Sequence, residues 1–226
     1  MRLRRYVPFV YWLTVVVVSI TGTLYTDILT DKQGVPLWIS TTTFAALLAV
    51  VFGVWYARER TLSIHAITST PREAFYWLAV LVTFALGAAA GDWTVELTSW
   101  GPGKSVLLPA ALIATVMLGW RIGGQPVLAF WLAYILTRPL GANIGDWFAS
   151  SRAEQGLGLG TALTSVIFLS AIAATVLYLT LSRRDVMPTG EVPDTGVRGQ
   201  DPVRERLALG IYAAGAVAAG VVLYAA

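Results

Sequence analysis

The chain has 226 residues, of which 56% are hydrophobic and only 13% are charged, and its mean hydropathy is +0.67. Soluble domains carry about 25% charged residues, so this composition excludes an ordinary water-soluble domain and indicates that lipid is the solvent. The formal net charge of +3 is explained by basic residues between the apolar stretches and requires no nucleic-acid partner.

Seven stretches are apolar enough to cross a bilayer as helices, which needs about 20 mostly apolar residues. In chain order they are 7–29, 36–56, 74–97, 106–122, 126–148, 158–181 and 207–226. Their continuous apolarity favours helices over barrel strands, which would alternate polar and apolar residues in segments of roughly ten. The sequence therefore predicts an all-α, polytopic membrane protein of about seven transmembrane helices.

One pattern occurs three times. An aromatic residue, Trp and Leu are followed by Gly ten residues after the Trp and by Asp five residues after the Gly. The members are Trp12, Trp77 and Trp131, then Gly22, Gly87 and Gly141, then Asp27, Asp92 and Asp146. Each copy opens a pair of predicted helices, which gives units at about 7–60, 72–122 and 126–184. Two crossings per unit make the repeats parallel, so we expect a rotation about the membrane normal and the three Asp residues at one depth.

The three units form a predicted membrane domain of residues 1–184. Residues 185–206 mix charges with Pro and Gly and are predicted to be a flexible cytoplasmic linker. The last stretch, 207–226, is predicted to cross the membrane once more. Its small residues, including Gly210, Gly215 and Gly220, allow close helix contact, so we interpret it as a packing helix.

Basic residues predict the orientation. Twelve of the 16 Lys and Arg residues fall in connections on one side, whereas Lys32, Lys104 and Arg152 fall on the other. The positive-inside rule then predicts a cytoplasmic N-terminus and, after seven crossings, an external C-terminus. The basic start of the chain precedes an apolar run, but we do not interpret it as a signal peptide, because its span matches the third and fifth spans.

Residues 72–92 (REAFYWLAVLVTFALGAAAGD) and 129–148 (AFWLAYILTRPLGANIGDWF), with WYARERTLSIH at 55–65, resemble a bacterial family of conserved membrane-anchored proteins. That family is built from repeats of unknown function called DUF347. The resemblance covers about residues 5–184 and implies pairs of transmembrane helices in the bacterial cytoplasmic membrane. Family members usually have four repeats, so either a first repeat lies upstream, or the last helix or a homo-oligomer replaces it. The resemblance implies no activity.

Several kinds of chemistry are excluded by what the chain lacks. It has no Cys, which excludes disulfides and thiolate sites, and one His, His65, which excludes a multi-His metal site within one chain. No Lys lies in a predicted span, which excludes a retinal Schiff base, and no Walker loop or hydrolase motif occurs. We therefore predict a protein that is not an enzyme and has no cofactor.

The three repeated Asp residues are the first candidate site. Each lies near the C-terminal end of its predicted helix, where the macrodipole disfavours a carboxylate by about 0.3–1 kcal/mol. Asp31 follows Asp27 by four residues and Glu96 follows Asp92 by four, so two units offer paired carboxylates, the ligands that hard cations prefer. The alternatives are a proton relay, or a structural role in which Gly-Asp pairs cap turns in the headgroup region.

Arg138 lies near the centre of the predicted span 126–148, directly before Pro139. A central Arg costs about 2.5–3.5 kcal/mol on insertion scales and usually faces a partner or an aqueous cavity. The equivalent positions of the other units hold Ser19 and Phe84. Three interpretations stay open. Arg138 balances the carboxylates, with Asp146 as the chosen partner; it binds an anionic substrate; or it forms a buried ion pair that determines packing.

The repeated Trp and Gly residues are interpreted as structural, the Trp residues as an aromatic belt and the Gly residues as close helix contacts. For the whole protein two functions stay open, each with the lipid bilayer as its surroundings. The leading one is a small transporter or channel that moves a cation, either a divalent metal or an ion coupled to protons. The alternative is a non-transporting membrane scaffold or partner-binding protein.

Overall fold

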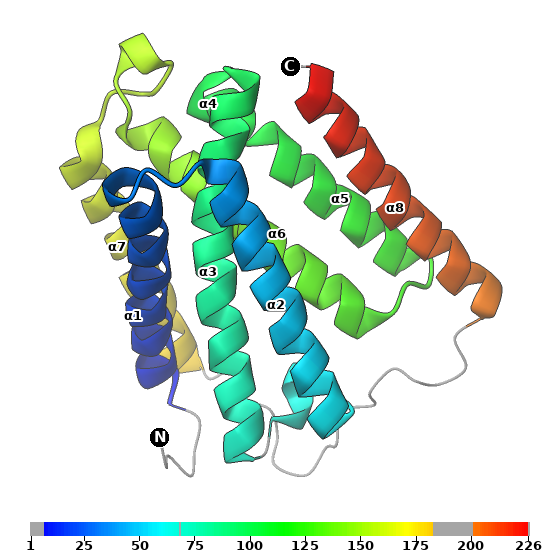
Figure 1. Ribbon diagram of the computed structural model, residues 1–226. Coiled ribbons are helices and arrows are strands. Elements are labelled where there is room, and N and C mark those ends of the chain that lie inside the picture. The colour runs from blue at the N-terminus through cyan, green and yellow to red at the C-terminus, as the bar shows by residue number, and fades with distance from the viewer. Residues whose placement is uncertain (1–6, 68, 183–200, 226) are drawn as a thin grey trace.

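The computed structural model describes residues 7–67, 69–182 and 201–225, and in these ranges it contains helices and no strand (Figure 1). Seven helices are long and apolar enough to cross a membrane. They are α1 (Pro8–Asp27) continued by the π-turn η1 (Ile28–Lys32), α2 (Leu37–Glu59), α3 (Thr70–Thr98), the short α4 (Gly101–Ser105) with α5 (Leu107–Arg121), α6 (Pro126–Ala149), α7 (Gly160–Ser182) and α8 (Pro202–Ala225). The predicted all-α fold with seven spanning helices is confirmed. The short 3₁₀ turns η2 (Ile64–Ala66) and η3 (Arg152–Glu154) lie in connections.

Local sequence explains where these helices begin and end. Pro8 and Pro126 open α1 and α6. Pro suits the first turn because the N–H that it lacks would have no acceptor there. At the other ends, Arg60 and Ser99 follow α2 and α3 with φ angles of 56° and 50°, the left-handed conformation that commonly ends a helix.

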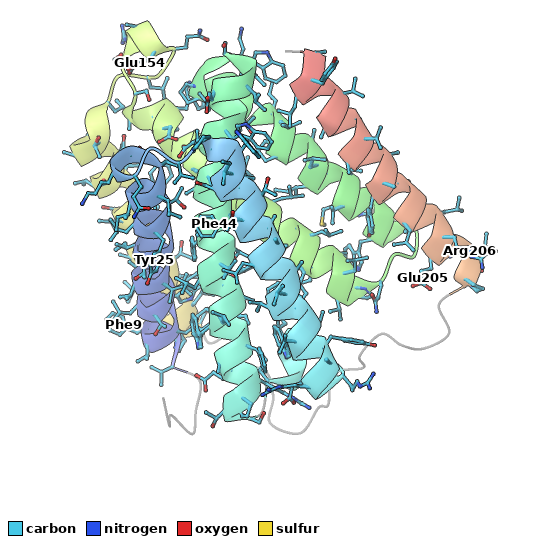
Figure 2. All side chains as sticks on the ribbon, viewed as in Figure 1. Phe9, Tyr25, Phe44, Glu154, Glu205 and Arg206 are labelled. Carbon is cyan, nitrogen blue, oxygen red and sulfur yellow. The ribbon has the colours of Figure 1, made fainter. Side chains whose placement is uncertain are left out.

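The outer surface of the bundle is apolar. On α1, the side chains of Phe9 and Tyr25 are 60% and 54% exposed and project from the helix (Figure 2). α7 and α8 have one or two buried residues each and otherwise expose apolar side chains. Such a surface is suited to lipid, because in water a contiguous apolar face of this extent would drive association.

The units interlock through their neighbours. α3 is the central helix, and α1, α2, α4 and α6 all pack against it (Figure 1). The second helix of a unit packs mainly on the first helix of the next unit, so that α2 lies on α3 and α5 lies on α6. α7 contacts both α6 and α1, and α8 lies along α5. Among the described helices α3 is therefore the inner one, and the first helices α1 and α6 of the other two units both pack against it.

Two of the three repeated Gly residues lie at close contacts between these first helices. A Cβ on Gly22 would lie 2.6 Å from the Cβ of Phe84, closer than real Cβ contacts. A Cβ on Gly87 would meet the Cβ of Arg138 in the same way. The third member, Gly141, has nothing within 4 Å of the position of a Cβ. The α1–α3 and α3–α6 contacts thus use equivalent positions, and the third unit lacks such a contact.

An aromatic core occupies the half of the bundle where α3 and α6 begin. Trp55 of α2 and Trp131 of α6 are 1% and 4% exposed, and their ring centroids are 5.8 Å apart. The indole Nε1 of Trp131 donates a hydrogen bond of 2.9 Å to the carbonyl of Leu62 in the connection after α2. Trp131 therefore lies in the core rather than in an aromatic belt, because the α2–α3 connection provides a buried acceptor.

The last helix begins earlier than the sequence predicts. α8 starts at Pro202 rather than at 207, so the end of the predicted linker is helical, while 183–200 lie outside the described residues. α8 packs on α5 where Tyr212 contacts Gly119 and where Gly215 lies against Thr115. The other two glycines predicted for close contact, Gly210 and Gly220, have no neighbour within 4 Å of a Cβ.

Candidate functional site

Four carboxylates gather at one end of the bundle, where α1 and α6 end and α3 approaches its last turns. Asp92 of α3 lies close enough to Asp146, Asp27 and Asp31 for each of them to repel it. Asp31 also repels Asp27. Since Asp27, Asp92 and Asp146 come from three different helices, the repeated arrangement itself brings them to this end (Figure 1).

These carboxylates differ in exposure. Asp92 and Asp27 are half-buried, whereas Asp31, Glu96 and Asp146 are exposed. Glu96 follows Asp92 within the continuous helix α3, so the two share a face as predicted from their spacing. Asp31 lies in the π-turn η1, whose wider i→i+5 turns alter the relation to Asp27 that the sequence predicted.

Within the described ranges no basic residue forms an ion pair with these four carboxylates. The ion pairs of the described residues lie elsewhere. They join Arg72 to Glu59 at 2.6 Å, near the start of α3, and Arg204 to Asp201 at 3.9 Å, near the start of α8. No three His, Asp or Glu side chains of the described residues lie close enough to hold one metal ion. The acidic end is therefore a region of negative charge, not a formed metal centre.

Arg138 interacts with aromatic rings. Its Cζ lies 3.7 Å from the ring centroid of Phe84 and 4.4 Å from that of Tyr134. A helical side chain leans toward the N-terminus of its helix, which carries Arg138 away from Asp146. In the part of the chain that the structure describes, no ion pair joins these two residues. The interactions of Arg138 are thus cation–π contacts in place of the predicted ion pair.

A row of tyrosines connects Arg138 with the aromatic core. The hydroxyls of Tyr11 and Tyr76 are 2.6 Å apart, which joins α1 to α3. Tyr134 lies within hydrogen-bonding reach of both Tyr76 and Arg138, which joins α3 to α6. The sequence analysis missed this row. Its signal is that Tyr11 and Tyr76 are the aromatic members of the repeated triplet, whereas the third unit has Phe130 there.

Two buried polar side chains, also missed from the sequence, hold the helices beside the acidic end. Thr26, which precedes Asp27 and is fully buried, donates a hydrogen bond of 2.9 Å to the carbonyl of Ala85 in α3. Asn143 in α6 is 1% exposed and donates a hydrogen bond of 3.0 Å to the carbonyl of Ser105. Such interhelical bonds position the backbone from which Asp27 and Asp146 project.

The model of a family described as Repeat of Unknown Function (DUF347) matches residues 10–61, 75–123 and 129–185. These segments agree within three residues with the units predicted from the spacing of Trp, Gly and Asp. No match to the chain was found among the curated proteins or among the solved structures. Because the three matched segments cover more than half of the residues, the chain belongs to the DUF347 repeat family.

Proposed function

We propose that the protein moves a small cation across the membrane and that the acidic end of α1, α3 and α6 is where the cation enters. The observation that carries this proposal is Asp92. It is half-buried in a spanning helix, other carboxylates repel it, and no described residue forms an ion pair with it. A carboxylate within a membrane span is costly unless a positive charge or a proton neutralises it. A bound cation supplies that charge.

Electrostatics also supports the acidic end as the place where the cation enters. Clustered charges of one sign in a low-dielectric surrounding raise the local concentration of the opposite ion. The C-terminal ends of α1 and α6 add the negative ends of their helix dipoles. Both effects attract cations and repel anions at this end of the bundle.

The opposite half of the bundle supports a transporter rather than an open channel. There the Tyr11–Tyr76 hydrogen bond joins α1 to α3, and the buried rings of Trp55 and Trp131 fill the core. A cation that reaches Asp92 continues only if these contacts separate. We therefore infer alternating access, in which the repeats move relative to one another around the site.

We infer the orientation from the basic residues at the two ends. The connections at the end opposite the acidic one, where the aromatic core lies, carry Arg58, Arg60, Arg72 and Arg121. Arg206 lies near the start of α8, at the same end (Figures 1 and 2). The acidic end carries Lys32, Lys104 and Arg152. By the positive-inside rule the acidic end faces outward and the N-terminus lies in the cytoplasm. The family resemblance adds the bacterial cytoplasmic membrane as the location.

A non-transporting scaffold is the second candidate. It is favoured by the packing of Arg138 against Phe84, which joins α3 to α6 in the middle of the bundle. Under this proposal the acidic residues end helices in the headgroup region, and the repeats serve only to present a surface to a partner.

A flux assay separates the two candidates. The purified protein is placed in proteoliposomes and tested with Na⁺, K⁺, Mg²⁺, Ca²⁺, Mn²⁺ and a pH gradient. Transport predicts flux of at least one ion, and Asp92→Asn should lower it by about tenfold or more, because an ionised ligand contributes about 1.5–3 kcal/mol. Glu205→Gln is the matched control, since it removes an acidic charge from the far end of α8 (Figure 2). Flux equal to that of empty liposomes for every ion would exclude transport and favour the scaffold.

A further inference from the structure

We propose that Arg138 is the centre of an intramembrane binding site for a small, singly charged carboxylate. This site is separate from the acidic end, and the inference does not depend on cation transport. Its starting point is the charge. A guanidinium stays protonated in proteins, so Arg138 carries a positive charge in the middle of a spanning helix. The described carboxylates form no ion pair with it, and we infer that an anion from solution neutralises it.

The two aromatic rings hold the guanidinium without using its hydrogen-bonding capacity. Cζ lies over the ring of Phe84 at 3.7 Å and over that of Tyr134 at 4.4 Å. Cation–π contacts of this kind orient the group, whereas its five N–H donors lie in the guanidinium plane. The rings therefore hold the guanidinium in place, and its Nε has no hydrogen-bond partner among the described residues.

One of those donors is buried without a partner in the part of the chain that the structure describes. Nε of Arg138 is enclosed and has no hydrogen-bond partner among the described residues. Buried donors of this kind are rare, because an unmade hydrogen bond costs about 1–3 kcal/mol and more for a charged group. A carboxylate matches the guanidinium fork with two parallel N–H···O bonds. Because protein atoms cover Nε, a carboxylate bonds to it together with a terminal nitrogen only when the side chains around Arg138 move aside.

The chain leaves room beside this group. Gly141 lies one turn beyond Arg138, and residues three apart share a helix face. A Cβ at Gly141 would meet nothing within 4 Å, whereas the equivalent Gly22 and Gly87 are packed against the next unit. Gly141 is exposed, so the position that a neighbouring helix fills in the first two units is open to the outside of the bundle in the third, one turn from Arg138.

The surroundings determine the class of anion. Phe84 and Tyr134 provide apolar contacts, and the Tyr134 hydroxyl, within reach of Arg138, adds a second donor. A single guanidinium neutralises one negative charge, so phosphate or another dianion would leave a net charge inside the span. A monocarboxylate with an apolar body fits both conditions. Ser19 and Phe84 stand at the equivalent positions, so the site occurs once per chain.

Thermal unfolding in a neutral detergent tests the site. The protein is titrated with sodium benzoate and sodium acetate, and with sodium chloride at equal Na⁺ concentration. A ligand that binds only the folded state raises the melting temperature, and we expect a saturable rise of several degrees with benzoate, a smaller one with acetate and none with chloride. A rise of the same size with chloride would overturn the carboxylate assignment.

Three variants locate the effect. Arg138→Gln should lose the response to benzoate, and Arg138→Lys, which keeps the charge but not the fork, should weaken binding by about tenfold or more. Arg121→Gln is the matched control, because Arg121 is exposed in the last turn of α5. It should respond as the unchanged protein does. If Arg138→Gln responds like the unchanged protein, the proposal is wrong.

Direct binding to the unchanged protein keeps the test independent of folding in the variants. Equilibrium dialysis with radiolabelled benzoate should saturate at one molecule per chain, and excess unlabelled benzoate should displace it. Failure to reach saturable binding would overturn the inference. A failure here together with positive cation flux would leave the proposed transport intact, so the two proposals fail separately.

Discussion

Gly87 of α3 lies directly against the Cβ of Arg138 of α6. Gly22 of α1 meets Phe84 of α3 in the same way, and Phe84 and Arg138 both stand seven residues after the Trp of their units. The two helix contacts thus follow one pattern: the repeated Gly of a unit packs against the residue that lies seven positions after the Trp of the next unit. Gly141 has no such neighbour, so the same residue type has a packing role in two units and an open face in the third.

This difference predicts opposite effects of one substitution. Gly87→Ala forces a Cβ against the Cβ and backbone of Arg138, which a helix cannot avoid by rotating a side chain. We expect a loss of about 1–3 kcal/mol in stability, as for other overpacked sites. Gly141→Ala should be neutral or stabilising by up to about 1 kcal/mol, because Ala has the higher helix propensity. Thermal unfolding in detergent measures both, and equal effects would contradict the packing rule.

Much of the fold could be predicted from the sequence because its signals are local. A run of about 20 apolar residues determines a spanning helix whatever its neighbours are. The constant spacing of Trp, Gly and Asp predicted three repeated units, and the family match confirms their number and positions. It also predicted that the three repeated Asp residues share one end of the bundle, since parallel repeats bring equivalent positions to equal depths.

The partners of individual side chains could not be predicted in this way. Asp146 was chosen as the partner of Arg138 from its position on the helix face, but a helical side chain leans backward, and Arg138 reaches Phe84 and Tyr134 instead. Trp131 was assigned to a membrane interface because nothing in the sequence shows that the Leu62 carbonyl lies beside it. Such contacts depend on which helices meet, and the second helices of the first two units, α2 and α5, pack on the first helix of the next unit.

The burial of Trp131 leads to a second prediction. Trp131→Phe removes the hydrogen bond to Leu62 and leaves a void in the aromatic core, so we expect a loss of about 2 kcal/mol or more. Trp38→Phe is the matched control, since Trp38 is 55% exposed, and it should change stability by less than about 0.5 kcal/mol. Equal changes in melting temperature for the two variants would contradict the core position of Trp131 and favour an aromatic belt.

A third prediction concerns the hydrogen bond between α1 and α3. Thr26→Val keeps the shape of the side chain but removes the donor to the Ala85 carbonyl, and we expect a loss of about 0.5–1.5 kcal/mol. Thr42→Val is matched in chemistry, but Thr42 is exposed and bonds to Trp38 within its own helix. The stability of the Thr42→Val variant should stay within about 0.5 kcal/mol of that of the unchanged protein. A double-mutant cycle with Gly22→Ala should show coupling for Thr26 and none for Thr42.

The inferred orientation can be tested with cysteine labelling, because the chain has no Cys of its own. Single substitutions Gln33→Cys and Tyr224→Cys should react with a membrane-impermeant maleimide in intact cells, whereas Arg58→Cys should react only after permeabilisation. All three positions are exposed. Labelling of Arg58→Cys and Tyr224→Cys under the same condition would mean that α8 does not complete a seventh crossing.

The last prediction concerns the acidic end without any measurement of transport. Asp92→Asn removes a half-buried charge that Asp27, Asp31 and Asp146 repel, and it keeps the size of the side chain. In cation-poor buffer we expect the variant to be more stable by about 1 kcal/mol, or about 2–4 °C in a chain of this size. Glu96→Gln removes an exposed charge one turn farther along α3, where water screens it, and should change stability by less than half as much.

Cation dependence completes this test. If the carboxylates form a cation site, adding Ca²⁺ or another transported ion stabilises the unchanged protein, because the ion binds the folded state and replaces repulsion with attraction. Asp92→Asn should lose most of this stabilisation, whereas Glu96→Gln should keep it. A variant Asp92→Asn that is less stable than the unchanged protein, with the same response to every cation, would mean that Asp92 has a structural role at the end of α3. The acidic end would then not be the entry site, and the scaffold would be the better account of the fold.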